Sequence, residues 1–481
     1  MALLEQIEIE QAGSGKPDVS GQTSPPASQL EQSPRHPLRD SLRTPIILVM
    51  LAVAFVKQIV LALAYPPFQG HDEVAHLGYL GTMANDGRLP TFSDRLPAAL
   101  ADYSQFTLDW PALYTANHPP LYYLVSLPAY ELAGGDYLKQ LCAVRLVAVP
   151  LFLLTVWLSY LIARNLFPDS DLITIGAPAV VAFQPQLGFE GAIVNNDILA
   201  ILFGTLLLYL SVRAIRDGLS LRLALTLGLV CGLGLLTKAT LLALLPVVAG
   251  VGVWCRWPGT WVRLRDGDWW RGTFVPAFAI VGPTVALALP WYLYLRRTYG
   301  DFTAFDATME LQGDWNRPAG TFTELLFSGA FLEERIHETW GYFGWRLIPL
   351  GSSELAVIYI AMALSGIGML VGVYRWLQRG RDDGWPARDS FLGEQAAGVA
   401  TLAVASLLMY GAMVYFGTMF LLTQARYFFP ILPVAIVLAV AGLRSLVPDG
   451  WQRPATVALV AGAAAFQMSI LVKLVLPYAY L

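Results

Sequence analysis

The stretch Tyr65-Pro-Pro-Phe-Gln-Gly-His-Asp-Glu-Val-Ala-His76 follows the first long apolar run of the chain, residues 45–65. It places two adjacent carboxylates, Asp72 and Glu73, and two histidines in a polar loop. A third histidine follows in Asn117-His-Pro-Pro-Leu-Tyr-Tyr123, where the prolines favour the start of a helix. Two acids at the mouth of an apolar segment are costly to shield from water unless they are used. We interpret this loop as the active site, and the simpler alternative is a pair of solvated loop acids.

The composition indicates that this loop belongs to a membrane protein. Of the 481 residues, 56% are hydrophobic and 14% are charged, whereas soluble domains carry about 25% charged residues. The formal net charge of -4 gives no reason to expect binding to nucleic acid. Three cysteines, Cys142, Cys231 and Cys255, lie in or beside apolar runs without metal-ligand spacing, so neither a disulfide framework nor a zinc site is predicted.

The apolar runs predict an all-α polytopic fold, because each crossing helix needs about 20 mostly apolar residues. After the first run they cover residues 120–134, 141–163, 171–189, 194–213, 221–237, 239–256, 273–295, 352–374, 397–421, 427–444 and 455–476. If every run crossed, the arginine-rich loops 256–271 and 375–388 would lie outside, against the positive-inside rule. We therefore predict that the shortest run, 120–134, is a surface or re-entrant helix. About 11 spans remain, within a range of roughly 10 to 13.

The apolar runs and the positive-inside rule together divide the chain into four segments. Residues 1–40 are polar and predict a disordered cytoplasmic tail, since nearby arginines place the N-terminus in the cytoplasm. Residues 41–300 form a transmembrane module that includes the outer loop 66–118, where short amphipathic helices are expected at the membrane surface. Residues 301–351 form a second extracytoplasmic loop, and 352–481 the remaining spans.

This topology brings further polar residues to the outer face. Asn195-Asn196-Asp197 opens a span, either as a helix cap or, through Asp197, as a metal ligand. Lys238 and the pair Arg426-Tyr427 interrupt or begin apolar runs. These cations either extend to the membrane surface or bind a lipid phosphate, for which the arginine fork is well suited.

Two further interpretations concern metal and sugar. His76 and Asp197 could hold a divalent cation such as Mg²⁺ or Mn²⁺ near the acidic pair. The spacing is not that of a zinc protease, because Asp72 occupies the first ligand position. Trp345 lies in the loop 301–351 among other aromatic residues, which could form an interfacial belt or stack on a sugar.

These motifs resemble the GT-C superfamily of membrane glycosyltransferases, which includes protein O-mannosyltransferases and the aminoarabinose transferases of lipid A. Two later motifs look more like a prokaryotic branch of that superfamily. The early motifs are Asp72-Glu73, His118-Pro119-Pro120-Leu121-Tyr122-Tyr123, Asn196-Asp197 and Gly234-Leu-Leu-Thr-Lys238, and the later ones are Trp340-Gly-Tyr-Phe-Gly-Trp345 and Gln424-Ala-Arg-Tyr-Phe-Phe-Pro430.

The resemblance implies a GT-C-like fold, a polyprenyl-phosphate sugar donor and an acceptor on the outer side. It also implies an acidic residue of the first outer loop that acts on the acceptor, which by position is Asp72 with Glu73 beside it. The chain departs from the usual pattern at Val74-Ala75-His76. The large soluble C-terminal domain of oligosaccharyltransferases is absent, so transfer of a complete N-glycan is not expected.

The resulting hypothesis is an inverting glycosyltransferase of a prokaryotic cell (inner) membrane. Asp72 would deprotonate an acceptor hydroxyl of protein, lipid or glycan, while Lys238, Arg426 and His118 would hold the donor phosphate. One rival is a non-enzymatic binder or flippase of lipid-linked sugars, and another is an assembly subunit of a cell-surface polysaccharide pathway. A flippase needs polar residues along a path through the bilayer, whereas here they gather at one face, which favours the enzyme.

Overall fold

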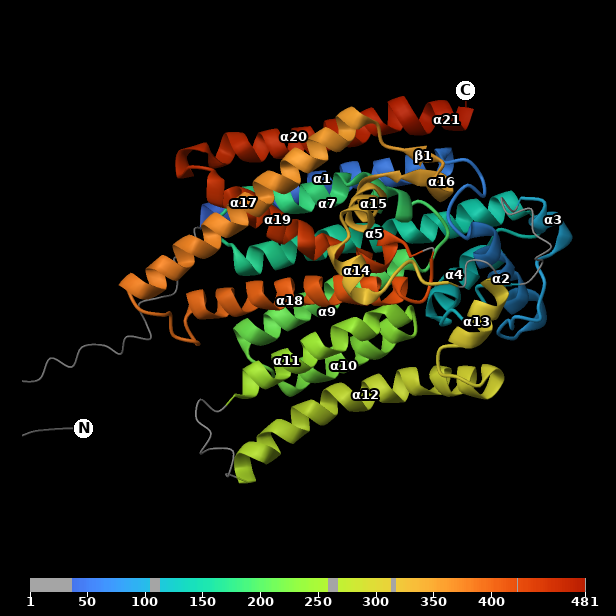
Figure 1. The fold of residues 1–481 in the computed structure, drawn as a ribbon, viewed down its shortest axis with the longest axis horizontal. Helices are drawn as coiled ribbons and strands as arrows, with labels where there is room; N and C mark the ends of the chain where they lie inside the picture. The colour runs from blue at the N-terminus through green and yellow to red at the C-terminus, as the bar shows by residue number, and fades with distance from the viewer. Residues whose placement is uncertain (1–36, 104–112, 258–266, 313–316, 422, 481) are drawn as a thin grey trace, which may run out of the picture. The chain divides into compact units, whose positions relative to one another are not determined.

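Long helices form a bundle in the computed structural model, which describes residues 37–103, 113–257, 267–312, 317–421 and 423–480. The described residues belong to one unit, Pro37–Leu481, in which most long helices run in a common direction (Figure 1). Residues 1–36 of the predicted tail lie outside the described residues, and the first helix begins at Pro37.

Nine helical segments in the described ranges are long and apolar enough to cross a membrane. This confirms an all-α membrane protein. The segments are α1 (Pro37–Ala64), α5 (Tyr137–Leu166), α9 (Asp197–Asp217), η2 with α11 (Ala239–Leu244, Leu245–Arg256), α12 (Gly267–Tyr299), α17 (Ser352–Asp382), α18 (Phe391–Gly417), η5 with α19 (Ala425–Ile431, Leu432–Leu446), and η6 with α20, η7 and α21 (Asp449–Trp451, Gln452–Ile470, Leu471–Val475, Leu476–Tyr480).

Two further predicted spans correspond to shorter helices. The run 171–189 is broken into α6 (Asp171–Thr174), α7 (Gly176–Phe183) and α8 (Pro185–Glu190), because Pro185 cannot continue α7. The run 221–237 contains only α10 (Leu221–Leu235), which packs between α9 and α12. At Gly228 of α10 a Cβ atom would collide with the backbone oxygen of Ile280 on α12, so the close packing of the two helices requires glycine.

The predicted non-crossing run 120–134 contains α4 (Leu121–Leu132), which has 12 residues. At 1.5 Å per residue such a helix is about 18 Å long, too short for a hydrocarbon core of about 30 Å. Other short elements lie in the two predicted outer loops. They are α2 (Glu73–Asp86), α3 (Ala98–Ala101), α13 (Phe305–Gln312), α14 (Phe322–Phe327), α15 (Gly329–Trp340), α16 (Phe343–Arg346) and β1 (Ile348–Pro349).

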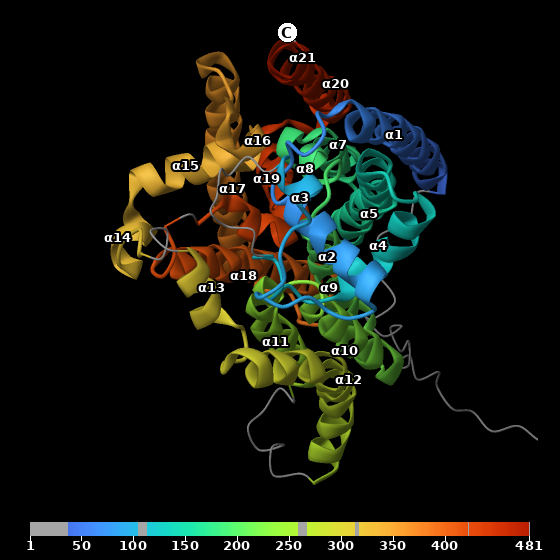
Figure 2. The same cartoon turned by 90° about the vertical axis from the view of Figure 1, so that its right-hand side faces the viewer.

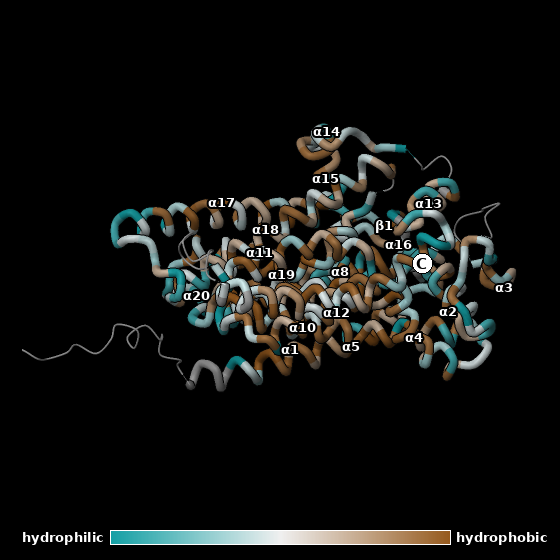
Figure 3. The backbone as a smooth tube through the Cα atoms, turned by 90° about the horizontal axis from the view of Figure 1, so that it is seen from below, coloured by the Kyte–Doolittle hydropathy of each residue, from teal (hydrophilic) through white to brown (hydrophobic). Residues whose placement is uncertain are grey.

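The short helices of the first loop pack on one end of the bundle and are partly buried there. Figure 2 shows α2 and α3 in front of the ends of the long helices, and α2 packs against α4. The first nine residues of α2 are buried. Apolar residues follow the middle of the long helices, and hydrophilic residues gather toward the two ends of the bundle (Figure 3). One end therefore carries a folded cap, which holds the candidate site.

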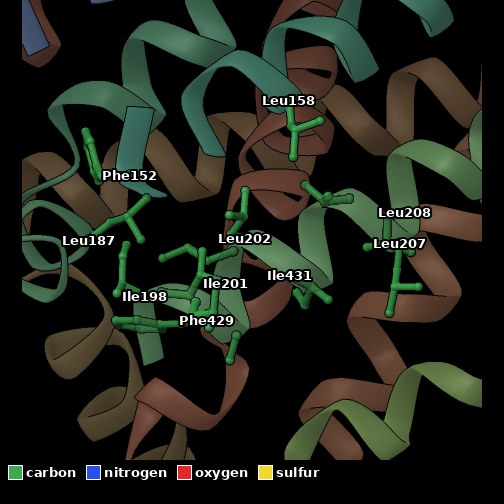
Figure 4. Packing of buried hydrophobic residues seen from close by; sticks show 14 of the residues in the cluster. Phe152, Leu158, Leu187, Ile198, Ile201, Leu202, Leu207, Leu208, Phe429 and Ile431 are labelled. Carbon is green, nitrogen blue, oxygen red and sulfur yellow. The ribbon is translucent and has the colours of Figure 1, made fainter. Parts of the chain in front are cut away.

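The core joins α9 to the segment that follows α18. Residues of α5, α8, α9 and η5 pack together around Ile198, Ile201 and Phe429 (Figure 4). Gly204 of α9 lies so close to η5 that a Cβ atom there would collide with the carbonyl of Pro430. This contact sets the position of η5, which carries Arg426.

Candidate active site

Glu73 begins α2 and is held by an arginine from the next long helix. The Arg145 guanidinium of α5 donates to both carboxylate oxygens of Glu73, from Nε at 2.7 Å and from Nη2 at 2.6 Å. The two side chains are only 1% and 0% exposed. A bidentate, charge-assisted pair is among the strongest side-chain contacts, and this one fixes the start of α2 against α5.

The same arginine closes the end of α1. Its remaining donors reach three backbone carbonyls, those of Ala62, Tyr65 and Pro66. Glu73 also accepts the backbone N–H groups of Gly70 and Val194 at 3.0 and 2.9 Å. Among the described residues, Glu73 is not part of the cavity wall that contains Asp72. Sequence reasoning missed Arg145, although an arginine inside the apolar run 141–163 was a usable signal.

Asp72 lines the cavity directly before α2, where its backbone is left-handed with φ of 58°. Aspartate tolerates this conformation better than most residues. Oδ1 accepts the Tyr114 hydroxyl at 3.1 Å, and Oδ2 accepts Nη1 of Arg426 at 2.9 Å. Burial alone would raise the pKa of Asp72, but the Arg426 guanidinium outweighs burial and holds this pKa well below its usual value. Asp72 is therefore an ionised, paired carboxylate.

Asp72 and Arg426 belong to a cluster of two buried acids and two partly buried cations. Asp197, the first residue of α9, pairs through Oδ1 with the Lys238 ammonium, and its Oδ2 lies 3.8 Å from Nη1 of Arg426. The formal charges of the cluster cancel. A membrane bundle can bury such groups because each charge has an opposite partner.

A cavity of about 930 Å³ opens beside this cluster. Its polar wall includes His118, Asn117 and Tyr427, and the Lys238 ammonium lies 5.6 Å from the centre of the Tyr427 ring. Much of the remaining wall is apolar, and is formed by Leu242, Trp291, Leu295, Met309, Met409, Met413, Phe416, Met419 and Phe420. A cavity that combines an apolar lining with cations suits an amphiphile with an anionic head group.

Two histidines share one tyrosine hydroxyl beside the cavity. The Tyr123 hydroxyl lies 2.8 Å from Nδ1 of His76 and 3.2 Å from Nδ1 of His118. Burial lowers the pKa of His76 to about 4, although Asp72 raises it in part. Burial lowers the pKa of His118 to about 3, and the Lys238 ammonium adds to this shift. Both imidazoles are therefore neutral at pH 7.

The buried histidines predict that the chain loses stability in mild acid. Below a pH of about 6.5 both histidines become protonated in the unfolded chain but stay neutral in the folded chain. The free energy of unfolding therefore decreases as the pH falls toward 4. The slope should reach about 1.4 kcal/mol per pH unit for each histidine. Unfolding midpoints in nanodiscs between pH 7.5 and 5 measure it, and the His118→Gln variant should show a smaller decline. A midpoint that does not change with pH would contradict the predicted protonation.

The residues of the predicted divalent-cation site make other contacts in the structure. The Asp197 carboxylate pairs with Lys238, and His76 uses Nδ1 for Tyr123. Within the part of the chain that the structure describes, no three His, Cys, Asp or Glu side chains form a group that could hold a metal ion. Binding of Mg²⁺ or Mn²⁺ by His76 and Asp197 stays a prediction.

The other predicted residues are divided between the cavity and its surroundings. His118, Lys238, Arg426 and Tyr427 line the same cavity as Asp72. The Trp345 side chain lies outside the described residues, so its predicted sugar contact stays a prediction.

Comparison with known proteins identifies the fold. Residues 117–300 match the model of the dolichyl-phosphate-mannose-protein mannosyltransferase family. The apo structure of ArnT from Cupriavidus metallidurans is similar with a TM-score of 0.50 at 18% identity, over 89% of this chain and 65% of ArnT. The chain has the GT-C fold. The resemblance seen in the sequence is thereby confirmed.

Other solved structures match with lower TM-scores. ArnT bound to undecaprenyl phosphate gives a TM-score of 0.49 at 18% identity, over 89% of this chain and 66% of ArnT. The Pmt1–Pmt2 protein O-mannosyltransferase complex of S. cerevisiae, bound to its sugar donor, gives 0.38 at 16% identity, over 52% and 34%. The chain spans about two thirds of the length of ArnT. No curated protein sequence matches it.

Proposed function

We propose that the chain is a membrane glycosyltransferase that moves a sugar from a polyprenyl-phosphate donor to an acceptor hydroxyl. The observation that carries the proposal is the cavity, whose wall combines Asp72, Lys238 and Arg426 with a large apolar lining. The apolar lining suits an isoprenoid chain and the cations suit its phosphate. The family match and the fold support this reaction class, and ArnT has been solved with undecaprenyl phosphate.

In this proposal Asp72 acts as general base and the cations stabilise the leaving group. The acceptor oxygen attacks the sugar carbon as the bond from that carbon to the phosphate oxygen breaks, through an oxocarbenium-like state. A phosphate can leave as an anion without being protonated, so Lys238 and Arg426 replace a general acid. A single displacement inverts the configuration at the sugar carbon. Glu73 would serve Asp72 as a positioning residue, through its anchor on Arg145.

We place the reaction on the extracytoplasmic face of a prokaryotic cell membrane. Two arginines in the last turn of α17 lie at the end of the bundle opposite to α2 (Figure 1). The positive-inside rule assigns such arginines to the cytoplasm, and this supports an outer site. The acceptor would be a hydroxyl of protein, lipid or glycan.

The test uses purified protein in lipid nanodiscs with a panel of radiolabelled polyprenyl-phosphate sugars. We expect label to leave the lipid for at least one sugar, at a rate that a chelator does not change. Donor binding without any release would contradict the enzyme and favour a binder of lipid-linked sugars. A rate lost on chelation would contradict the proposal that cationic side chains stabilise the leaving phosphate.

Arg426→Lys keeps the charge but removes the planar fork that can bind phosphate through two parallel hydrogen bonds. We expect the dissociation constant for undecaprenyl phosphate to rise about tenfold, measured by quenching of tryptophan fluorescence, because Trp291 lines the cavity. The matched control is Arg444→Lys, at the far end of the helix that follows η5. It should leave binding unchanged, and equal affinities in the two variants would contradict the role of Arg426.

A further inference from the structure

His118, Tyr123 and His76 form a hydrogen-bonded chain that leads from the cavity into the protein. His118 lines the cavity, whereas the other two residues do not appear among the described cavity residues. We propose that this chain is a proton relay, which takes the proton released by sugar transfer away from the acceptor. The inference rests on the proposed function, because it concerns the proton of that reaction.

The geometry allows the chain two arrangements. The Tyr123 hydroxyl has one hydrogen, and it lies within hydrogen-bond distance of Nδ1 on both histidines. When it donates to His76, it can accept from His118, and when it donates to His118, it can accept from His76. Each arrangement fixes one tautomer of each imidazole. Passing from one arrangement to the other moves a proton along the chain without moving a heavy atom far.

Packing holds the three residues in this order. Tyr123 of α4 is fully buried, and its ring stacks on Tyr79 of α2 with centroids 3.5 Å apart and planes at 4°. His76 lies on α2, one turn before Tyr79, and is 1% exposed. The ring stack joins the two helices, so the hydroxyl has little freedom to leave its two partners.

Charge favours movement of a proton from His118 toward His76. A proton on His118 is opposed by Lys238 and Arg426, which lie in the same cavity wall, and is favoured by Asp72 alone. A proton on His76 is favoured by the Asp72 and Asp197 carboxylates, although Arg426 and Lys238 oppose it there too. The inner end of the chain therefore faces the more negative surroundings, and the cavity does not keep an additional positive charge.

In the transfer step the acceptor O–H bond breaks, the acceptor oxygen bonds to the sugar carbon, and the electron pair of the broken sugar bond stays on the phosphate oxygen. Asp72 takes the proton first and returns it readily, because Arg426 keeps it a weak base. Cavity water then carries the proton to Nε2 of His118. His118 passes its Nδ1 proton to the Tyr123 oxygen, and Tyr123 passes its own proton to Nδ1 of His76, which becomes an imidazolium. Because burial lowers the pKa of His76 to about 4, His76 holds the proton only for the time of transfer, and the proton returns along the chain to cavity water once the phosphate has left.

Tyr123→Phe tests the relay, because it removes one oxygen atom and keeps the stacked ring. In nanodiscs we expect the single-turnover rate of sugar transfer to fall about 10- to 100-fold, with the dissociation constant of undecaprenyl phosphate unchanged. The solvent deuterium isotope effect on transfer should also change. The control is Tyr122→Phe, which removes a buried hydroxyl from the neighbouring residue and should keep the wild-type rate.

His76→Asn is a second variant, which removes the inner acceptor and should lower the rate in the same way. A Tyr123→Phe protein with the wild-type rate and isotope effect would overturn the relay and leave the transferase proposal intact. A parallel loss of rate and carrier binding would also overturn it, because Tyr123 would then only place His118. A wild-type protein that transfers no sugar from any donor would overturn the transferase and the relay together.

Discussion

Asp72→Asn should lower the rate of sugar transfer by about 10²- to 10⁴-fold, the usual contribution of a general base. The same change should tighten binding of undecaprenyl phosphate. Nη1 of Arg426 now donates to Asp72 at 2.9 Å, so the carboxylate and a donor phosphate compete for one guanidinium. Asparagine leaves the cluster with one more positive than negative charge, and we expect about tenfold tighter binding. Filter binding and transfer of labelled donor measure the two effects separately.

Asp301→Asn is the matched control for this prediction. Asp301 also lines the cavity, but its oxygens accept backbone N–H groups of residues 303, 305 and 306, and the asparagine oxygen can keep part of this turn. Transfer and binding should both stay close to wild type. Transfer that persists in Asp72→Asn would remove Asp72 from the reaction. Weaker carrier binding in that variant would show that Asp72 does not compete with the phosphate.

Sequence reasoning could find the residues of the cavity because membrane topology restricts where polar loops lie. Asp72, Lys238 and Arg426 are far apart in the chain, but each follows or precedes an apolar run at the same predicted face. The direction of each span then brings them to one end of the bundle. This prediction does not require knowing which residues contact each other, because the alternating direction of the crossing helices already assigns each loop to one face of the membrane.

The same reasoning could not choose partners within that end. Glu73 pairs with Arg145, 72 residues away, and Asp197 with Lys238, 41 residues away. These choices depend on how helices rotate and pack, which periodicity does not fix when nearly every face is apolar. The ambiguity over metal arose here too, because a carboxylate that binds a cationic side chain looks the same in sequence as one that binds a metal ion.

The lengths of the helices could not be predicted from the sequence either. The run 221–237 reads as a span, yet α10 has 15 residues and lies between neighbouring helices. The C-terminal half of α10 is mostly buried, so protein replaces lipid around that end and the helix need not match the full thickness of the bilayer. Its C-terminal end leads to Lys238 in the polar cavity, where the backbone can leave the helix without facing hydrocarbon.

The anchor between Glu73 and Arg145 should be the largest electrostatic contribution to stability near the site. Glu73→Gln leaves the Arg145 guanidinium buried without a counter-charge, and Arg145→Met leaves the Glu73 carboxylate in the same condition. Breaking a buried pair in this way costs about 3–5 kcal/mol. We expect each single variant to lower the unfolding midpoint in nanodiscs sharply, and to slow transfer because Asp72 precedes Glu73 in the chain.

The double variant Glu73→Gln with Arg145→Met separates the charge from the packing. No charge is then left unpaired, so part of the lost stability should return, although three carbonyls near the end of α1 lose their donor. Arg88→Gln is the control, because its pair with Asp94 is half exposed and such pairs contribute little. If the double variant lost as much stability as the two single variants together, the carbonyl contacts rather than the ion pair would hold the first loop in place.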